Sequence, residues 1–228
     1  MKSWVIAAVA LAGGLIGAGG VHLAGRADGD AAVRDYLLEH PEVIPEAMDR
    51  LQRREQARAV ASTGDAITRA YAGAFMGNPR GDVTLVEYYD YNCGICRANL
   101  PVVQQLVRSD PNLKVVFREL PVLAPSSRDA ARASLAAARQ NRFGAFHTAL
   151  FGAGRVTPQS IALAARAAGV TLPADDRAAE AEIGRNLETA GRLGITGVPS
   201  WIVGDEVLIG AQSADRLRRA IAEARAEG

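Results

Sequence analysis

Cys93 and Cys96 are the only cysteines of the chain, and only Gly94 and Ile95 separate them. Thiols at this spacing can close a small disulfide, hold a metal ion or act as a redox pair. A strand-like run over residues 83–89 precedes them, and a helix is predicted from about Cys93. A helix N-terminus stabilises a thiolate through its free N–H groups. We therefore expect Cys93 to be the attacking thiol and Cys96 to be a buried thiol that resolves a mixed disulfide.

Metal binding is the main alternative to redox chemistry. A structural zinc site needs four ligands, but the chain has no second CxxC pair and its histidines, His22, His40 and His147, are isolated. Cu(I) can be held by two thiolates alone, so a Cu(I)-binding protein remains an alternative. A purely structural disulfide between the two cysteines would stabilise the fold little, because the loop that it closes is too short to constrain the unfolded chain. We predict no metal site and no organic cofactor.

The composition predicts one domain with a substantial core and an accessory segment. The chain has 228 residues, of which 49% are hydrophobic. Its 26 basic and 25 acidic residues leave a net charge of +1. A balanced charge of this kind predicts no nucleic-acid partner.

The N-terminal residues 1–27 read as a signal peptide or a membrane anchor. Lys2 precedes an uncharged, apolar stretch over residues 3–25, which is long enough to span a bilayer. The cleavage site near residue 26 is mediocre, which slightly favours the uncleaved anchor. The positive N-terminus favours the cytoplasmic side, so the body of the protein should be exported into an oxidising compartment.

Residues 28–73 are predicted to form a helical arm, with breaks near Pro41 and Pro45. The apolar stripe over residues 44–51 fades from Gln52 onward. Such an arm either packs on the main domain or pairs with another copy. Residues 30–60 are therefore a possible oligomerisation segment.

Residues 74–228 alternate strands and helices. A strand, a helix that starts near Cys93 and a strand over residues 113–118 form a βαβ unit. A block of helices over about residues 124–194 follows, and then a hairpin with strands at 200–203 and 207–209. A last helix is capped by Ser213. The fold class is α/β with an all-helical insertion.

The active-site segment resembles a known family. Residues 87–96, Glu-Tyr-Tyr-Asp-Tyr-Asn-Cys-Gly-Ile-Cys, are similar to the segment around the cysteines of DsbA-type thiol:disulfide oxidoreductases. That family has a thioredoxin-like fold with a helical insertion. Pro101 lies where such proteins kink the active-site helix, and residues 197–199, Gly-Val-Pro, precede a strand where the family has a cis-proline loop.

The resemblance implies roles for the residues around the cysteine pair. Glu87 matches the family's buried acid, which can relay a proton to or from Cys96; the alternative is a surface glutamate on an edge strand. The Cys93–Cys96 disulfide would be the redox group. Pro199 would have a cis bond that turns Val198 towards the cysteines. The residues expected to contact a client peptide are then Val198, Gly94 and Ile95.

The arm carries a second resemblance. Residues 33–44 are similar to the segment that precedes DsbA-like domains in ScsC-type proteins, which are linked with copper tolerance. Some of those proteins oligomerise through this segment and act as isomerases, whereas others are monomeric. The short apolar stripe does not decide between these states.

Together these features predict a periplasmic protein-disulfide oxidoreductase. Its partners would be client proteins with thiols or disulfides and a DsbB-like or DsbD-like membrane redox protein. The alternatives are a Cu(I)-binding copper-tolerance protein and an assembly factor that keeps one client reduced. The sequence does not fix the direction of electron flow.

Overall fold

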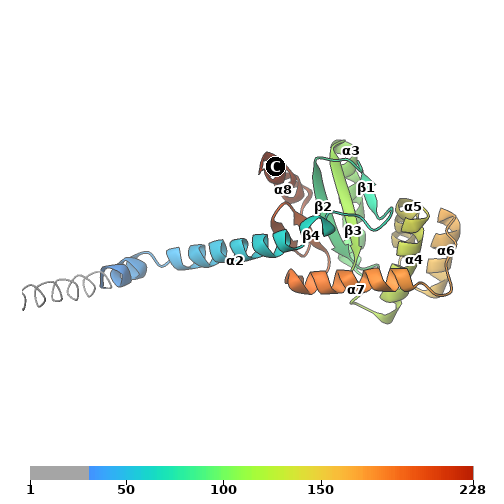
Figure 1. Cartoon of the computed structure of the whole chain (residues 1–228), viewed down its shortest axis with the longest axis horizontal. Coiled ribbons are helices and arrows are strands. Elements are labelled where there is room, and N and C mark those ends of the chain that lie inside the picture. The colour runs from blue at the N-terminus through green and yellow to red at the C-terminus, as the bar shows by residue number, and fades with distance from the viewer. Residues whose placement is uncertain (1–30, 228) are drawn as a thin grey trace, which may run out of the picture. The chain divides into compact units, whose positions relative to one another are not determined.

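The computed structural model describes residues 31–227 (Figure 1). A helix over residues 31–39 comes first. The elements that follow are α2 (Val43–Ser62), η1 (Gly64–Ala66), β1 (Phe75–Gly77), β2 (Val83–Tyr89), α3 (Gly94–Ser109), β3 (Leu113–Glu119), α4 (Pro125–Arg139), α5 (Phe143–Gly152), α6 (Pro158–Ala168), α7 (Arg177–Arg192), β4 (Ser200–Val203), β5 (Glu206–Ile209) and α8 (Ala214–Glu227).

The chain divides into two compact units, and the boundary between them lies inside α2, between Gln52 and Arg53. Among the described residues, no helix has both the length and the apolar character needed to cross a membrane. The apolar stretch over residues 3–25, and the whole predicted signal or anchor segment, lie outside the described residues.

A five-stranded sheet, in the order β1-β3-β2-β4-β5, forms the centre of the second unit. β2 and β3 are parallel and pair over seven residues, from Val83 opposite Leu113 to Tyr89 opposite Glu119. The other neighbouring strands are antiparallel. A parallel pair needs a crossover, and α3 provides it. The predicted βαβ unit is therefore confirmed.

Successive residues of β2 face opposite sides of the sheet. Leu85 and Tyr89 belong to the core that contains α3 and α8, whereas Val86 and Tyr88 belong to the core that contains α7. Glu87 has the parity of Leu85 and Tyr89, so it faces the side of the sheet on which the cysteine helix lies.

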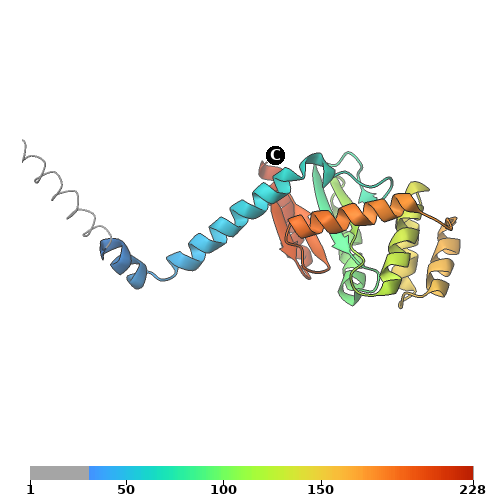
Figure 2. The same cartoon turned by 60° about the horizontal axis from the view of Figure 1, so that its bottom comes forward.

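The predicted helical insertion is present as α4 to α7. In Figures 1 and 2, α4, α5 and α6 gather on one side of the domain and α8 lies on the other. Thr157 caps α6, because the Ser160 N–H donates to Thr157 Oγ1 at 3.1 Å and Pro158 occupies the first turn. The helix ends at Gly169, whose φ of 67° is left-handed. Ser213 caps α8, as expected.

Some boundaries differ from the sequence prediction. The break near Pro41 is observed, but the one near Pro45 is wrong: Pro45 lies in the first turn of α2, where a backbone N–H has no helical partner and proline is tolerated. α2 ends at Ser62, so residues 63–72 do not continue the helical arm; they form a connector made of the short 3-10 helix η1 and turns. The sequence analysis missed β1, because a strand of only three residues, the last of them Gly77, is too short to show an alternation of apolar and polar side chains. A Cβ at Gly77 would lie 2.4 Å from the Leu113 carbonyl oxygen.

The connector, residues 63–72, is held to the sheet by a buried arginine of β3. Arg118 Nη2 donates to the carbonyl oxygens of Ala66, Ile67 and Arg69, the last at 2.8 Å. Its Nη1 donates to Glu182 Oε1 of α7 at 3.0 Å. One guanidinium therefore links the connector, the sheet and α7.

We predict that Arg118→Met destabilises the fold by about 3–5 kcal/mol, because it leaves Glu182 Oε1 and three connector carbonyls without their donor. Urea unfolding followed by circular dichroism measures this loss. Arg219→Met is the matched control, since Arg219 is exposed on α8, and it should change stability by less than about 0.5 kcal/mol. Equal stability of the two variants would contradict this role of Arg118.

Candidate active site

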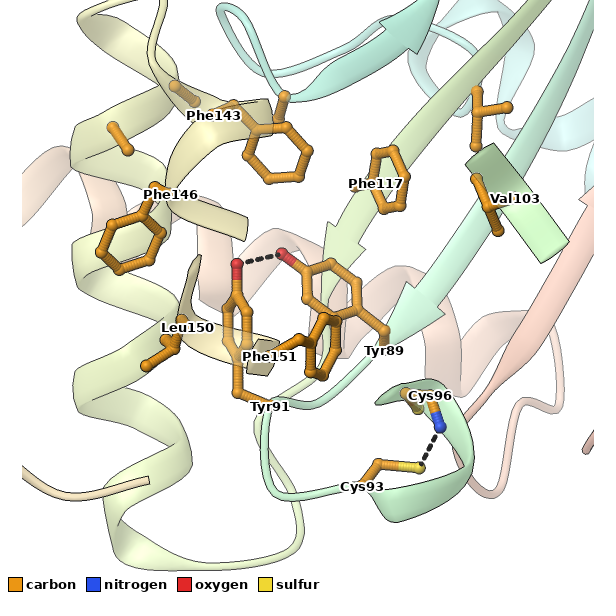
Figure 3. Close-up of a cluster of buried hydrophobic side chains, with 14 of the residues drawn as sticks. Tyr89, Tyr91, Cys93, Cys96, Val103, Phe117, Phe143, Phe146, Leu150 and Phe151 are labelled. Carbon is orange, nitrogen blue, oxygen red and sulfur yellow. Dashed lines mark hydrogen bonds between the residues drawn. The ribbon is translucent and has the colours of Figure 1, made fainter. Parts of the chain in front are cut away.

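Cys93 lies at the N-terminus of α3, as the sequence predicted. It is the N-cap residue, and its sulfur accepts a hydrogen bond from the Cys96 backbone N–H at 3.1 Å (Figure 3). The sulfur thus receives one of the free N–H groups of the first helical turn. Both cysteines are present as thiols. A backbone donor aimed at Cys93 Sγ stabilises a negative charge on this sulfur.

Cys96 is in a different environment one turn further along. It is 1% exposed and belongs to the core under the sheet. Burial raises the pKa of the Cys96 thiol well above its ordinary value, and its hydrogen bond with Cys93 raises it further. Of the two sulfurs, Cys96 is therefore the one that needs a nearby base before it can react.

Glu87 is the candidate for the base that Cys96 needs. It is 3% exposed, in the middle of β2, with Phe117 and Trp201 as its neighbours on the adjacent strands. Burial raises the pKa of Glu87 to about 8. Its charge also contributes to the raised pKa of Cys96, so the two groups interact electrostatically. The surface-glutamate interpretation of Glu87 is therefore wrong.

The Val198–Pro199 segment closes the other side of Cys93. The peptide bond between Val198 and Pro199 is cis. The Cys93 thiol donates to the Val198 carbonyl oxygen at a distance of 3.6 Å. The structure therefore brings Cys93, Cys96, Glu87 and the Val198–Pro199 segment together, although they come from β2, α3 and the turn before β4.

Gly94 and Ile95 lie on the open side of the cysteine pair. Gly94 is exposed, and a Cβ built on it would meet no atom within 4 Å. The Ile95 side chain is 51% exposed. Access to the cysteine pair from solvent is therefore past these two residues.

Asp90 is a site residue that sequence reasoning missed. It is 1% exposed, and its carboxylate accepts hydrogen bonds from the backbone N–H groups of Asn92 at 2.8 Å and of Val122 and Leu123 at 3.0 Å. It thereby fixes the turn that leads into Cys93 against the loop after β3. An aspartate between a buried strand and a helix is a sequence signal for such a turn.

A buried network of hydroxyl groups behind the cysteines was also missed. Tyr89 Oη donates to Glu119, and Tyr91 Oη contacts Ser134 Oγ at 3.0 Å and His147 Nδ1 at 2.9 Å. Figure 3 shows Tyr89 and Tyr91 with their hydroxyls facing each other. Burial raises the pKa of Glu119 to about 8 and lowers that of His147 to about 3, so both are neutral near pH 7. These tyrosines, and also Trp201, are core residues and do not line a groove.

No cluster of three or more His, Cys, Asp or Glu side chains that could hold a metal ion is present within residues 31–227. His147 is enclosed by the aromatic rings of Tyr91, Phe143 and Phe151. His40 lies in the turn after the first described helix, with its Nδ1 3.4 Å from Glu42.

Comparison with protein families identifies the fold. Residues 84–222 match the model of the DSBA-like thioredoxin domain, which is more than half of the chain. The chain belongs to the DsbA-like thioredoxin family. Residues 30–58 match a second model, the N-terminal domain of the copper resistance protein ScsC. Both resemblances expected from the sequence are thus confirmed, and the DsbA-like domain is an oxidoreductase domain.

Solved structures agree with this assignment. A linker-deleted variant of Proteus mirabilis ScsC is 28% identical and covers 88% of this chain and 95% of its own, with a TM-score of 0.73. A thioredoxin-like oxidoreductase from Silicibacter pomeroyi is 38% identical over 72% of this chain and 98% of its own, with a TM-score of 0.68. A periplasmic thioredoxin-like protein from Salmonella enterica is 33% identical over 71% and 95%, with a TM-score of 0.66.

The curated relatives are much longer proteins. The Na(+)/H(+) antiporter NhaA 1 of Salinispora arenicola is 28% identical over 158 residues, which is 65% of this chain but 24% of that protein. The NhaA 3 antiporter of Salinispora tropica is 27% identical and also matches over 24% of its length. The chain therefore spans about a quarter of the length of these relatives.

We predict that Glu87→Gln flattens the dependence of stability on pH. The folded DsbA-like domain holds the Glu87 proton up to about pH 8, whereas the unfolded chain releases it near pH 4.5. The folded state therefore binds more protons between these values, and Glu87 makes stability fall as pH rises through the window. Between about pH 5.5 and 7.5 the wild type should lose roughly 1.4 kcal/mol per pH unit relative to Glu87→Gln.

Urea unfolding at several pH values measures this difference. Glu188→Gln is the control, because Glu188 is exposed on α7 and its curve should run parallel to that of the wild type. If the free energy of unfolding of Glu87→Gln depends on pH in the same way as that of the wild type, Glu87 is ionised in the folded protein and the prediction is wrong.

Proposed function

We propose that the chain is an exported protein-disulfide oxidoreductase that forms, reduces or isomerises disulfides in client proteins. One observation carries the proposal: Cys93 Sγ lies at a helix N-terminus with the Cys96 N–H aimed at it and the Val198 carbonyl opposite. The Cys96 N–H favours a thiolate on Cys93, and the Val198 carbonyl oxygen offers an acceptor to a client backbone beside it. The redox group is the Cys93–Cys96 pair, which would form a disulfide in the oxidised protein.

In the oxidising direction, a client thiolate attacks Cys93 Sγ of the Cys93–Cys96 disulfide. A client–Cys93 bond forms, and the electron pair of the broken bond passes to Cys96. Glu87, protonated near pH 7, supplies the proton that the buried Cys96 needs. A second client thiolate then displaces Cys93 and leaves the client oxidised by two electrons. A DsbB-like membrane protein would take these electrons.

In the reducing or isomerising direction the same steps run backwards. The Cys93 thiolate attacks a client disulfide, and Cys96 then displaces the client sulfur after giving its proton to the ionised form of Glu87, which is the minor form near pH 7. Reduction leaves the pair as a disulfide, which a DsbD-like membrane protein would reduce. Isomerisation ends with a different client disulfide and an unchanged enzyme.

The client would lie over the open side of the site. Ile95, Val122 and Leu123 are 51–53% exposed, and Asp90 holds the last two beside the turn that leads into Cys93. Apolar side chains of the client would pack on these three residues and on Gly94, while its backbone would pair with Val198 in the manner of an added strand. Pro199 has no N–H, so it offers no competing donor on this side.

We predict that Cys93→Ser reduces insulin reduction and thiol oxidation to background, because the remaining thiol, Cys96, is buried and burial raises its pKa. Cys96→Ser should instead accumulate a mixed disulfide between Cys93 and the client, since the resolving thiol is absent. Non-reducing gels and mass spectrometry measure both. The Cys93→Ser, Cys96→Ser double variant is the control and should trap nothing. Catalysis that survives in Cys93→Ser would refute the proposal.

The direction of electron flow can be read in cells. Alkylation of thiols in the intact periplasm separates oxidised from reduced protein. A mostly oxidised Cys93–Cys96 pair assigns the oxidase direction and a DsbB-like partner. A mostly reduced pair assigns isomerase or reductase action, including the case of an assembly factor that keeps one client reduced, and a DsbD-like partner.

A Cu(I)-binding protein is the second candidate. It is supported by the match of residues 30–58 to the N-terminal domain of a copper resistance protein, together with two thiols that can hold Cu(I) without further ligands. Competition against a Cu(I) chelator separates the two functions. Tight stoichiometric binding that needs both Cys93 and Cys96, with no turnover of clients, would favour the copper function.

For location we propose the periplasm. The similar Salmonella enterica protein is periplasmic, and residues 3–25 have the composition of an anchor or a signal segment. Fractionation of cells and intact-mass measurement of the purified protein distinguish an anchored chain from one cleaved near residue 26.

The arm is proposed as an oligomerisation segment. Within the first unit, Ile44, Met48 and Leu51 of α2 are 47–60% exposed and follow helical spacing on one face. An exposed apolar stripe of this kind is buried when two or more copies associate.

We predict that a Met48→Glu, Leu51→Glu double variant is monomeric in light scattering, whereas the wild type forms an oligomer. Gln52→Glu adds charge next to the stripe and should leave the oligomer intact. A monomeric wild type at micromolar concentration would contradict the oligomer and leave the chemistry of Cys93 and Cys96 unaffected.

A further inference from the structure

A second cleft lies on the face of the sheet opposite the cysteines. Its volume is about 300 Å³, and it lies between the connector, residues 63–72, and α7. We call it the arginine cleft, because its lining includes Arg69, Arg118, Arg185 and Arg192. Arg118 and Tyr88 lie on the face of the sheet that packs against α7, so neither is part of the redox site on the other face.

The charge of the arginine cleft is unbalanced. The acid in its lining is Glu182, which accepts from Arg118 Nη1 at 3.0 Å and from Arg185 Nη2 at 2.7 Å. Four arginines against one glutamate leave a net charge of +3. Neither Arg69 nor Arg192 forms an ion pair with any residue of the described chain. A further cation, Lys114, donates to the Thr68 carbonyl oxygen close to Arg118.

Two buried donors at this place have no acceptor. Arg118 is 8% exposed, and its Nε finds no hydrogen-bond partner among the described residues. The hydroxyl of Tyr88, which is 0% exposed, also lacks one. Tyr88 lies directly opposite Arg118 in the pairing of β2 with β3. A buried donor without an acceptor costs about 1–3 kcal/mol, which a bound acceptor would recover.

We propose that the arginine cleft binds a free inorganic oxyanion, phosphate or sulfate, between the connector and α7. A tetrahedral oxyanion presents acceptors in several directions, and the planar fork of a guanidinium matches two of its oxygens. Arg192 of α7 and Arg69 of the connector supply the unpaired charge. Arg118, which also lines the cleft, has an unused donor at its buried Nε.

Binding would have a structural consequence for the connector. Arg69 and Arg192 come from segments more than a hundred residues apart, and one anion between them would join the connector to α7. It would add to the Arg118 hydrogen bonds that already hold the carbonyls of Ile67 and Arg69. Oxyanion occupancy therefore stabilises the part of the chain that precedes β1.

Calorimetric titration of inorganic phosphate into the full chain tests the proposal, with chloride used to keep the ionic strength constant. The wild type should bind one phosphate, sulfate should compete for it, and the melting temperature should rise with phosphate. Arg192→Gln and Arg69→Gln should each weaken binding about ten-fold or more. Arg219→Gln, which removes an exposed arginine of α8, should bind like the wild type.

Hydrogen exchange gives an independent readout. Phosphate should slow exchange of the connector amides in the wild type and in Arg219→Gln but not in Arg192→Gln, while insulin reduction stays equal in all three. A phosphate effect of the same size in wild type and Arg192→Gln would overturn the proposal. So would the absence of saturable phosphate binding by the folded, active wild type.

Discussion

The parallel pairing of β2 with β3 determines where Cys93, Cys96 and Glu87 of the redox site lie. Its seven residue pairs bury both strands and align their carboxyl ends at one edge of the sheet. The chain that leaves this edge from β2 forms the Asp90 turn and then α3, so Cys93 begins a helix directly at the edge. The same register puts Glu119 next to Tyr89, and the odd residues of β2 turn Glu87 towards α3. A one-residue slip would move Glu87 to the other face.

Burial then makes two chemically identical thiols unequal. Both cysteines are at most 5% exposed, yet Cys93 Sγ receives the Cys96 N–H of the first helical turn, whereas burial dominates at Cys96 and raises the pKa of its thiol. Desolvation opposes charge on Cys96, Glu87 and Glu119 alike, so this side of the sheet is a region of neutral acids. The contrast between the two sulfurs follows from their places on one helical turn.

Local patterns in the sequence were sufficient to predict the βαβ unit, the helical insertion and the place of Cys93. They failed where a residue's role depends on a distant partner. Arg118 reads as a polar residue at the end of a strand, but its partners lie 49–68 residues away. Glu119 is buried against Tyr89 and Ser134 of α4, which its own segment does not indicate. His147 follows Phe143 and precedes Phe151 by four residues each, so the apolar spacing of α5 did offer a signal for its burial. β1 has three residues and is defined only by its pairing with β3.

The hydrogen bond from the Cys93 thiol to the Val198 carbonyl links substrate docking to ionisation. Only a protonated sulfur can donate this bond, so the bond favours the thiol over the thiolate. Under the proposed function, a client backbone N–H that takes the Val198 oxygen removes the acceptor of the thiol proton. The carbonyl oxygen that an arriving client needs for docking is thus the one that the resting thiol already occupies, so the client and the thiol would compete for a single acceptor.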